Sequence, residues 1–107
     1  MFNRGTIVLV PFPFTDLMAS KVRPALVVSR PIPGDDVILV FISSKRGSEG
    51  KYDVLVEPSK RNGLKTSSTI KCAKIATLDK RVILGELGAL EAGIMNSVSK
   101  NLMKILV

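Results

Sequence analysis

The first 85 residues alternate between short apolar stretches and polar connections that contain proline or glycine. Runs of β-branched and aliphatic residues predict strands at residues 6–10, 23–29, 37–42 and 52–56. Residues 68–78 alternate in part between apolar and polar positions, which predicts a half-buried strand and allows a bend midway. A short apolar run at residues 82–84 predicts the last strand.

Prolines, glycines and charged residues mark the connections. Pro11 and Pro13 are expected to end the first strand, because proline cannot donate to the ladder. Residues 31–35 have turn composition, residues 43–51 form a polar loop, and residues 58–63 predict a short helical turn that Gly63 ends.

The hydrophobic period changes near Leu90. Apolar residues then recur three or four positions apart, which predicts one amphipathic C-terminal helix with Glu91 in its first turn and Lys104 in its last. Short strands followed by one helix predict a mainly β fold with a C-terminal α-helix. We expect a small, partly open antiparallel barrel or sheet against which the helix packs.

Length and composition limit the possibilities further. A chain of 107 residues predicts a single domain over residues 1–107. Its hydrophobic content of 46% is high for a small soluble domain, which points to a second apolar surface in a subunit interface.

Charge and the rare residue types narrow the chemistry. The net charge of +7 predicts attraction to polyanions, whether nucleic acid, an anionic membrane or an acidic protein. The absence of histidine, together with a single cysteine, Cys72, excludes an intrachain disulfide, a cysteine-based metal cluster and a Ser-His or Cys-His nucleophile. The beginning of the chain lacks a signal-peptide pattern and no apolar stretch could span a bilayer, so we expect a cytoplasmic protein.

Several polar positions could carry function. Arg23, which precedes Pro24, could bind a phosphate through its planar fork or be a plain surface cation. Ser43 and Ser44 follow an apolar strand and could either bind a phosphate or sugar hydroxyl, or end the strand.

Two further segments carry positive charge. Lys45, Arg46 and Lys51 lie in a loop that could follow a nucleic-acid backbone or be a solvated hairpin. Beyond residues 67–69, Lys71 and Lys74 would face opposite sides of an unbulged strand, so only one could join a shared groove.

The order and spacing of the segments are more specific than any one of them. Together they closely resemble the MazF/PemK family of type II toxins, which are mRNA interferases. The resemblance covers nearly the whole chain and is carried by RGTIVLVPFPFTD at 4–16, KVRPALVVS at 21–29, ISS at 42–44, GLKTSSTIK at 63–71, KIATL at 74–78 and GELG at 85–88.

This resemblance implies a small SH3-like barrel of the CcdB/MazF-like type, a homodimer, and sequence-selective cleavage of single-stranded RNA, often mRNA. The catalytic arginine of the family falls on Arg23. Its hydroxyl partner, commonly threonine, falls on Ser43 or Ser44, and Ser43 gives the better register because it follows Ile42 directly. The segment 13–22 resembles a loop that shapes the RNA groove and that the antitoxin displaces. The residues expected to contact RNA are Asp16, Lys21, Ser44, Lys45, Arg46 and Lys71.

The implied chemistry needs neither a metal nor another cofactor, because RNA supplies its own 2′-hydroxyl nucleophile. Arg23 would stabilise the charge on the phosphoryl oxygens and Ser43 would orient the phosphate or the 2′-hydroxyl. The products would be a 2′,3′-cyclic phosphate and a 5′-hydroxyl, with Arg23 itself, Asp16 or water as the general base. A groove built for RNA would also attract a cognate acidic antitoxin. A CcdB-like gyrase-binding toxin and a non-catalytic nucleic-acid-binding barrel are the two alternatives.

Overall fold

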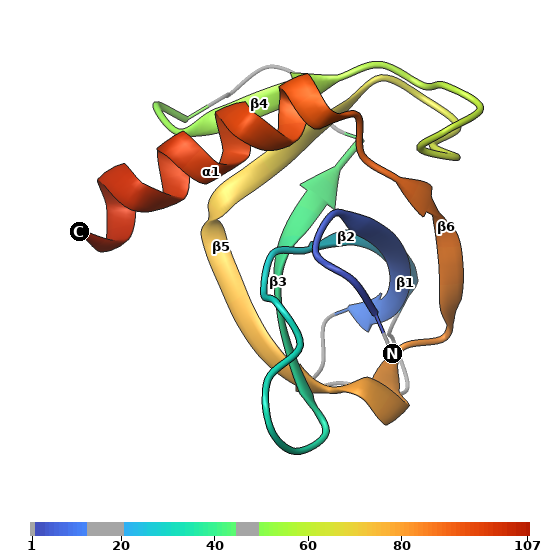
Figure 1. Ribbon diagram of the computed structural model, residues 1–107. Helices are drawn as coiled ribbons and strands as arrows, with labels where there is room; N and C mark the ends of the chain where they lie inside the picture. Colours follow the sequence, from blue (N-terminus) through green and yellow to red (C-terminus); the bar gives the residue numbers. More distant parts are fainter. Residues whose placement is uncertain (1, 13–20, 45–49) are drawn as a thin grey trace.

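The computed structural model describes residues 2–12, 21–44 and 50–107. Within them, six strands, one short 3-10 helix and one α-helix follow in chain order (Figure 1). Their bounds are β1 Thr6–Phe12, β2 Lys21–Val27, β3 Asp36–Ser43, β4 Asp53–Val56, β5 Ser68–Asp79, η1 Lys80–Val82, β6 Gly85–Ala89 and α1 Ala92–Leu106. This confirms the prediction of a mainly β fold with one C-terminal helix.

The six strands form one curled antiparallel sheet in the order β4-β5-β3-β2-β1-β6. Both faces of its central strands are buried. Ile7, Leu26 and Val40 belong to one hydrophobic cluster, whereas the adjacent Val8 and Leu39 belong to a second. This explains why these strands read as continuous apolar runs rather than as alternating ones.

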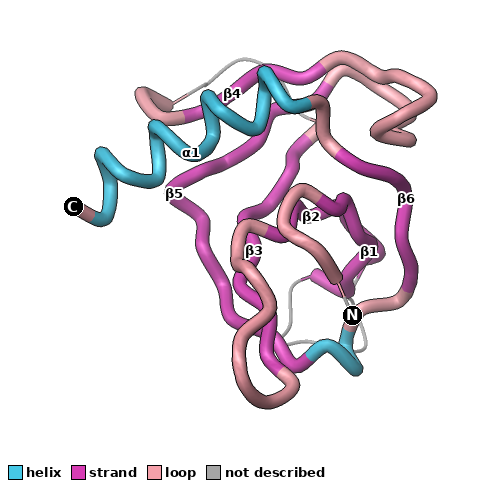
Figure 2. The backbone as a smooth tube through the Cα atoms, in the orientation of Figure 1, coloured by secondary structure: helices cyan, strands magenta, loops and turns pink. Residues whose placement is uncertain are grey.

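Helix α1 covers the first cluster. It lies along β4 and β5, as Figure 2 shows, and contributes the buried side chains of Met95 and Val98. The predicted apolar helix face is therefore the face that packs on the sheet. No helix among the described residues is long and apolar enough to cross a membrane.

The turn between β4 and β5 contacts β6, the strand at the other edge of the curled sheet. The Ala89 amide donates to the Arg61 carbonyl at 2.8 Å. The two backbones approach so closely that a Cβ atom on Gly88 would lie 2.2 Å from that carbonyl oxygen. Gly63, at φ +72°, would likewise place a Cβ atom 2.3 Å from the carbonyl oxygen of Leu87. Only glycine fits at these two positions.

Some predicted boundaries are wrong. The apolar run at 82–84 is not a strand: η1 takes up Lys80–Val82, and the last strand is β6 at Gly85–Ala89. Strand β1 also continues through Pro11, where the loss of a donor is tolerated because β6 pairs with β1 only as far as Leu9.

The bend allowed in the long strand is present. Opposite Val40 and Phe41, β5 changes register from Ile75 to Lys71, so that three of its residues are inserted. Glu91 was expected in the first turn of the helix, but it is the residue before α1. Its carboxylate accepts hydrogen bonds from Ser59 and Asn62, because the turn between β4 and β5 lies beside the beginning of the helix.

Candidate functional site

Arg23 lies in the first half of β2, where it is half-buried. Its ladder partner on β1 is Val10, and it shares the sheet face of Ala25 and Val27, which belong to the second hydrophobic cluster. Within the part of the chain that the structure describes, its guanidinium forms no ion pair. A permanent positive charge is thus held by a rigid strand at the end of an apolar core.

Ser43 is the last residue of β3 and reaches the same face as Arg23. The ladder between β2 and β3 pairs Ala25 with Phe41. Arg23 and Ser43 each lie two residues beyond this last pair of the ladder, so the alternation along the two strands puts their side chains on the same sheet face. The two residues predicted to act together therefore lie on one face of adjacent strands.

The register extends across β5 and β4 as two parallel rows of side chains on that face. The Ser43 row consists of Ser43, Thr69 and Leu55, and the Lys71 row consists of Ala25, Phe41, Lys71 and Asp53. Arg23 lies on the same face of β2, two residues before Ala25. The face thus gathers one guanidinium, two hydroxyls and one lysine from the three strands β2, β3 and β5.

Lys71 is already engaged by a carboxylate. Its ammonium group lies 2.8 Å from a carboxylate oxygen of Asp53, whose side chain is only 7% exposed. Asp53 also accepts a hydrogen bond from the Gly50 amide at 2.7 Å. The predicted contact of Lys71 with RNA therefore has to coexist with this ion pair.

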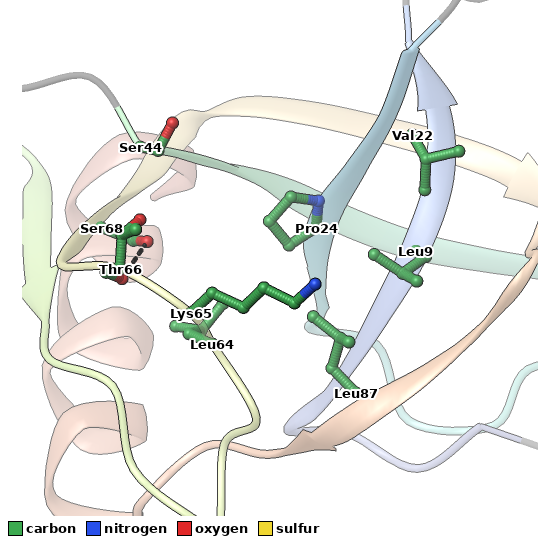
Figure 3. Close-up of a pocket in the computed structure, with 9 residues that line it drawn as sticks. All are labelled: Leu9, Val22, Pro24, Ser44, Leu64, Lys65, Thr66, Ser68 and Leu87. Carbon is green, nitrogen blue, oxygen red and sulfur yellow. Dashed lines mark hydrogen bonds between the residues drawn. The ribbon is translucent and has the colours of Figure 1, made fainter.

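Ser44 lies on the other side of the sheet from Ser43. It lines a pocket of about 370 Å³, together with Val22 and Pro24 of β2 (Figure 3). Neither Arg23 nor Ser43 lines this pocket, whereas their neighbours in the sequence, Val22, Pro24 and Ser44, do. Lys65 extends into the pocket between Pro24 and Leu87, and the remaining walls come from Leu9, Leu64, Thr66 and Ser68.

The other predicted RNA contacts are placed only in part. Lys21 begins β2 and is exposed. Asp16, Lys45 and Arg46 lie outside the described residues. Among the described residues, no three histidine, cysteine, aspartate or glutamate side chains gather where they could hold a metal ion. Metal independence stays a prediction.

Three polar residues of these surfaces were not singled out individually from the sequence: Asp53, Lys65 and Thr69. In the sequence Thr69 is only one residue of the segment 67–69, and Asp53 only one residue of the strand predicted at 52–56. Only the strand register shows that they are neighbours of Lys71 and Ser43. Cys72 has no part in either surface, since it is fully buried and burial raises the pKa of its thiol.

Comparison with known proteins identifies the family. The model of the PemK-like, MazF-like toxin of type II toxin-antitoxin systems matches residues 3–106. The chain belongs to this toxin family. The resemblance that the sequence segments indicated is thereby confirmed. A search among curated proteins finds no significant match.

Solved structures agree with the fold of a MazF-like toxin. An endoribonuclease in complex with its cognate antitoxin, from a mycobacterial species, is 24% identical, with a TM-score of 0.79 over 99% of this chain and 95% of that one. The Mycobacterium tuberculosis toxin MazF-mt6 is 19% identical, with a TM-score of 0.74 over 92% and 93%.

A third structure has the same architecture. The MazE-MazF complex (Form-III) from Deinococcus radiodurans is 21% identical, with a TM-score of 0.78 over 98% and 95% of the two chains. The predicted MazF-like fold is therefore confirmed, although the sequence identities are low.

Proposed function

We propose that this MazF-like toxin is a metal-independent endoribonuclease that cleaves single-stranded RNA, in particular mRNA, at selected sequences. The observation that supports the proposal is the position of Arg23 and Ser43 on one sheet face, each two residues beyond the last pair of the β2–β3 ladder, in a chain that belongs to this toxin family. We take residues 1–107 as one such toxin domain.

The proposed reaction uses the nucleophile of the substrate. The 2′-oxygen of the ribose attacks the adjacent phosphorus, the bond to the 5′-oxygen of the next nucleotide breaks, and that oxygen leaves as a hydroxyl. Arg23 stabilises the charge that develops on the phosphoryl oxygens, and Ser43 donates a hydrogen bond to one of them. The 2′-proton passes to Asp16 or water, since Arg23 could accept it only after losing a proton of its own. Water supplies the proton that completes the leaving 5′-hydroxyl. The products are a 2′,3′-cyclic phosphate and a 5′-hydroxyl.

The positive charge of the chain supports RNA as substrate. Lys21 lies two residues before Arg23 on β2, exposed at the beginning of the strand, where it can contact the next phosphate. Asp16, Ser44, Lys45 and Arg46 complete the proposed contacts. Lys71, which Asp53 neutralises in part, would add less attraction than a free lysine.

The proposed partners follow from the same surfaces. An acidic antitoxin segment would compete with RNA for the positive groove and fold there. Large exposed apolar side chains, which include Val22, Leu55 and Leu84, support burial of a further surface in a homodimer. We place this activity in the cytoplasm, where mRNA is available.

Incubation of the purified toxin with a long single-stranded RNA in EDTA, followed by mapping of the fragment ends, tests the proposal. We expect discrete cuts with cyclic-phosphate and 5′-hydroxyl ends. Arg23→Ala should slow cleavage by about 100-fold to 1,000-fold, as the loss of one charge-stabilising donor does. Arg23→Lys should remain impaired, because an ammonium cannot replace the bidentate fork.

Ser43→Ala and Ser44→Ala form a matched pair. They remove the same hydroxyl from adjacent residues that reach opposite faces of the sheet. We expect Ser43→Ala to lower kcat strongly, whereas Ser44→Ala, which removes only a binding contact, should raise KM and leave kcat within about twofold, with unchanged circular dichroism for both. Intact RNA with inhibited gyrase would favour a CcdB-like toxin. Salt-sensitive RNA retention without cleavage would favour a non-catalytic barrel.

A further inference from the structure

Thr69 carries a hydroxyl group that finds no hydrogen-bond partner among the residues that the structure describes. The residue is 1% exposed, and its Oγ1 atom is buried without a donor or an acceptor to meet it. No other described side chain is in this situation. A buried unpaired hydroxyl is destabilising, whereas valine would fill the same volume without a polar atom. Because the unpaired hydroxyl lowers the stability of the free protein, we infer that it forms a hydrogen bond when RNA is bound.

The position of Thr69 indicates that use. Thr69 is the ladder partner of Ser43, so the two side chains lie next to each other on the same sheet face. On its other side Thr69 pairs with Leu55 of β4, and β5 is therefore held between two strands at this point. The unpaired hydroxyl stands on rigid backbone, one strand away from the proposed catalytic serine.

We propose that Thr69 is a positioning residue that orients the hydroxyl of Ser43 during RNA cleavage, an inference that rests on the proposed function. When a phosphate occupies the site, the Thr69 hydroxyl donates to the oxygen of Ser43. The Ser43 hydroxyl then donates to a phosphoryl oxygen. The two bonds form one directed chain, in which each strengthens the other.

The serine at position 43 explains why such help is useful. A β-branched side chain restricts its own χ1 angle, whereas serine has no second heavy atom on Cβ and rotates more freely. A hydrogen bond from Thr69 would supply from the neighbouring strand a restraint of the kind that the second heavy atom on Cβ gives to threonine. Substitution of Ser43 by threonine should then make Thr69 dispensable.

The experiment compares cleavage by the full-length toxin and by its Thr69→Val, Thr69→Ser, Ser43→Thr and Ser43→Thr/Thr69→Val variants. We expect Thr69→Val to lower kcat by about threefold to tenfold with an unchanged KM, which corresponds to the loss of one neutral hydrogen bond. Its Tm should stay the same or rise by about 4 °C, since an unpaired hydroxyl is removed. Thr69→Ser should retain most of the activity.

The effect of Thr69→Val in the Ser43→Thr background distinguishes a positioning role of Thr69 from a merely structural one. In the Ser43→Thr background, Thr69→Val should change kcat by less than about twofold. An unchanged kcat for Thr69→Val in an active wild-type toxin would overturn this inference and leave the ribonuclease proposal intact. The inference would also fall if Thr69→Val lowered kcat equally in both backgrounds or lowered the Tm together with kcat. A wild-type toxin that leaves RNA intact would overturn the proposed function itself, and with it this role of Thr69.

Discussion

The carboxylate of Asp53 accepts a hydrogen bond from the Lys71 ammonium group at 2.8 Å across the β4–β5 ladder, and both side chains are largely withdrawn from solvent. The pair lies one row away from Ser43 on the same sheet face. Burying such an ion pair costs desolvation free energy. Removing only one of its two charges destabilises the fold more, because the remaining charge stays buried without a partner.

Asp53→Asn should therefore lower the free energy of unfolding by about 3 kcal/mol. The matched control is Lys80→Met. It removes a 3.5 Å ion pair with Asp35 in which both side chains are well exposed, and it should cost less than about 0.5 kcal/mol. Urea denaturation of the three proteins measures both changes. An Asp53→Asn variant as stable as Lys80→Met would show that the pair is solvated in solution.

The same ion pair predicts a difference between two lysines in RNA binding. Lys21 is exposed and forms no ion pair with another residue in the described ranges, whereas Lys71 is paired with Asp53. For a 2′-O-methylated RNA, which cannot be cut, Lys21→Met should reduce the slope of log K against log salt concentration by about 0.7. Lys71→Met should reduce it by clearly less. Fluorescence anisotropy between low and moderate salt measures both slopes, and a larger effect of Lys71→Met would reverse the assignment.

The elements of the fold could be predicted because each apolar run is long enough to fill a strand or a helix face. The prediction failed where a run was short. Residues 82–84 carry three apolar side chains, but Asp79 accepts hydrogen bonds from the Arg81 backbone and side chain and begins a 3-10 turn there. Local polar capping outweighed a weak strand propensity.

Short sequence segments nominate Arg23 and Ser43, and their roles stay a prediction. The proximity of Asp53 to Lys71, or of Thr69 to Ser43, could not be predicted in this way, because it depends on strand register. Register is fixed by the packing of both sheet faces and not by any single segment. Ser43 and Ser44 are also separated in this way. They are adjacent in an extended segment, so their side chains lie on opposite sides of the sheet.

The close contact between β6 and the turn before β5 predicts that alanine at Gly88 strongly destabilises the fold, whereas alanine at Gly85 has little effect. Gly88→Ala would place its Cβ atom 2.2 Å from the Arg61 carbonyl oxygen, so a backbone must move. We expect the variant to lose about 3 kcal/mol or more of stability. Gly85→Ala, in the same strand, meets nothing within 4 Å and should change stability by less than about 1 kcal/mol. Thermal unfolding compares the two, and equal Tm values would contradict the close approach.

Glu91 predicts how the anchoring of α1 depends on pH. Its carboxylate accepts hydrogen bonds from Ser59 and from the fully buried Asn62, and the bond from Ser59 is the main reason that its pKa lies below the ordinary value of 4.5. Because the folded chain holds the charged form more tightly than the unfolded chain does, this stabilisation is complete above pH 4.5. It is lost as the pH falls through the lowered pKa.

Glu91→Gln should therefore be less stable than the wild-type protein at pH 7, and the gap in Tm should narrow steadily between about pH 5 and pH 3. Asp79 titrates separately, because hydrogen bonds from Arg81 lower the pKa of its carboxyl to about 2. An Asp79→Asn background removes that contribution and should leave the narrowing intact. A gap that stayed constant with pH would mean that Glu91 anchors the helix equally well when protonated.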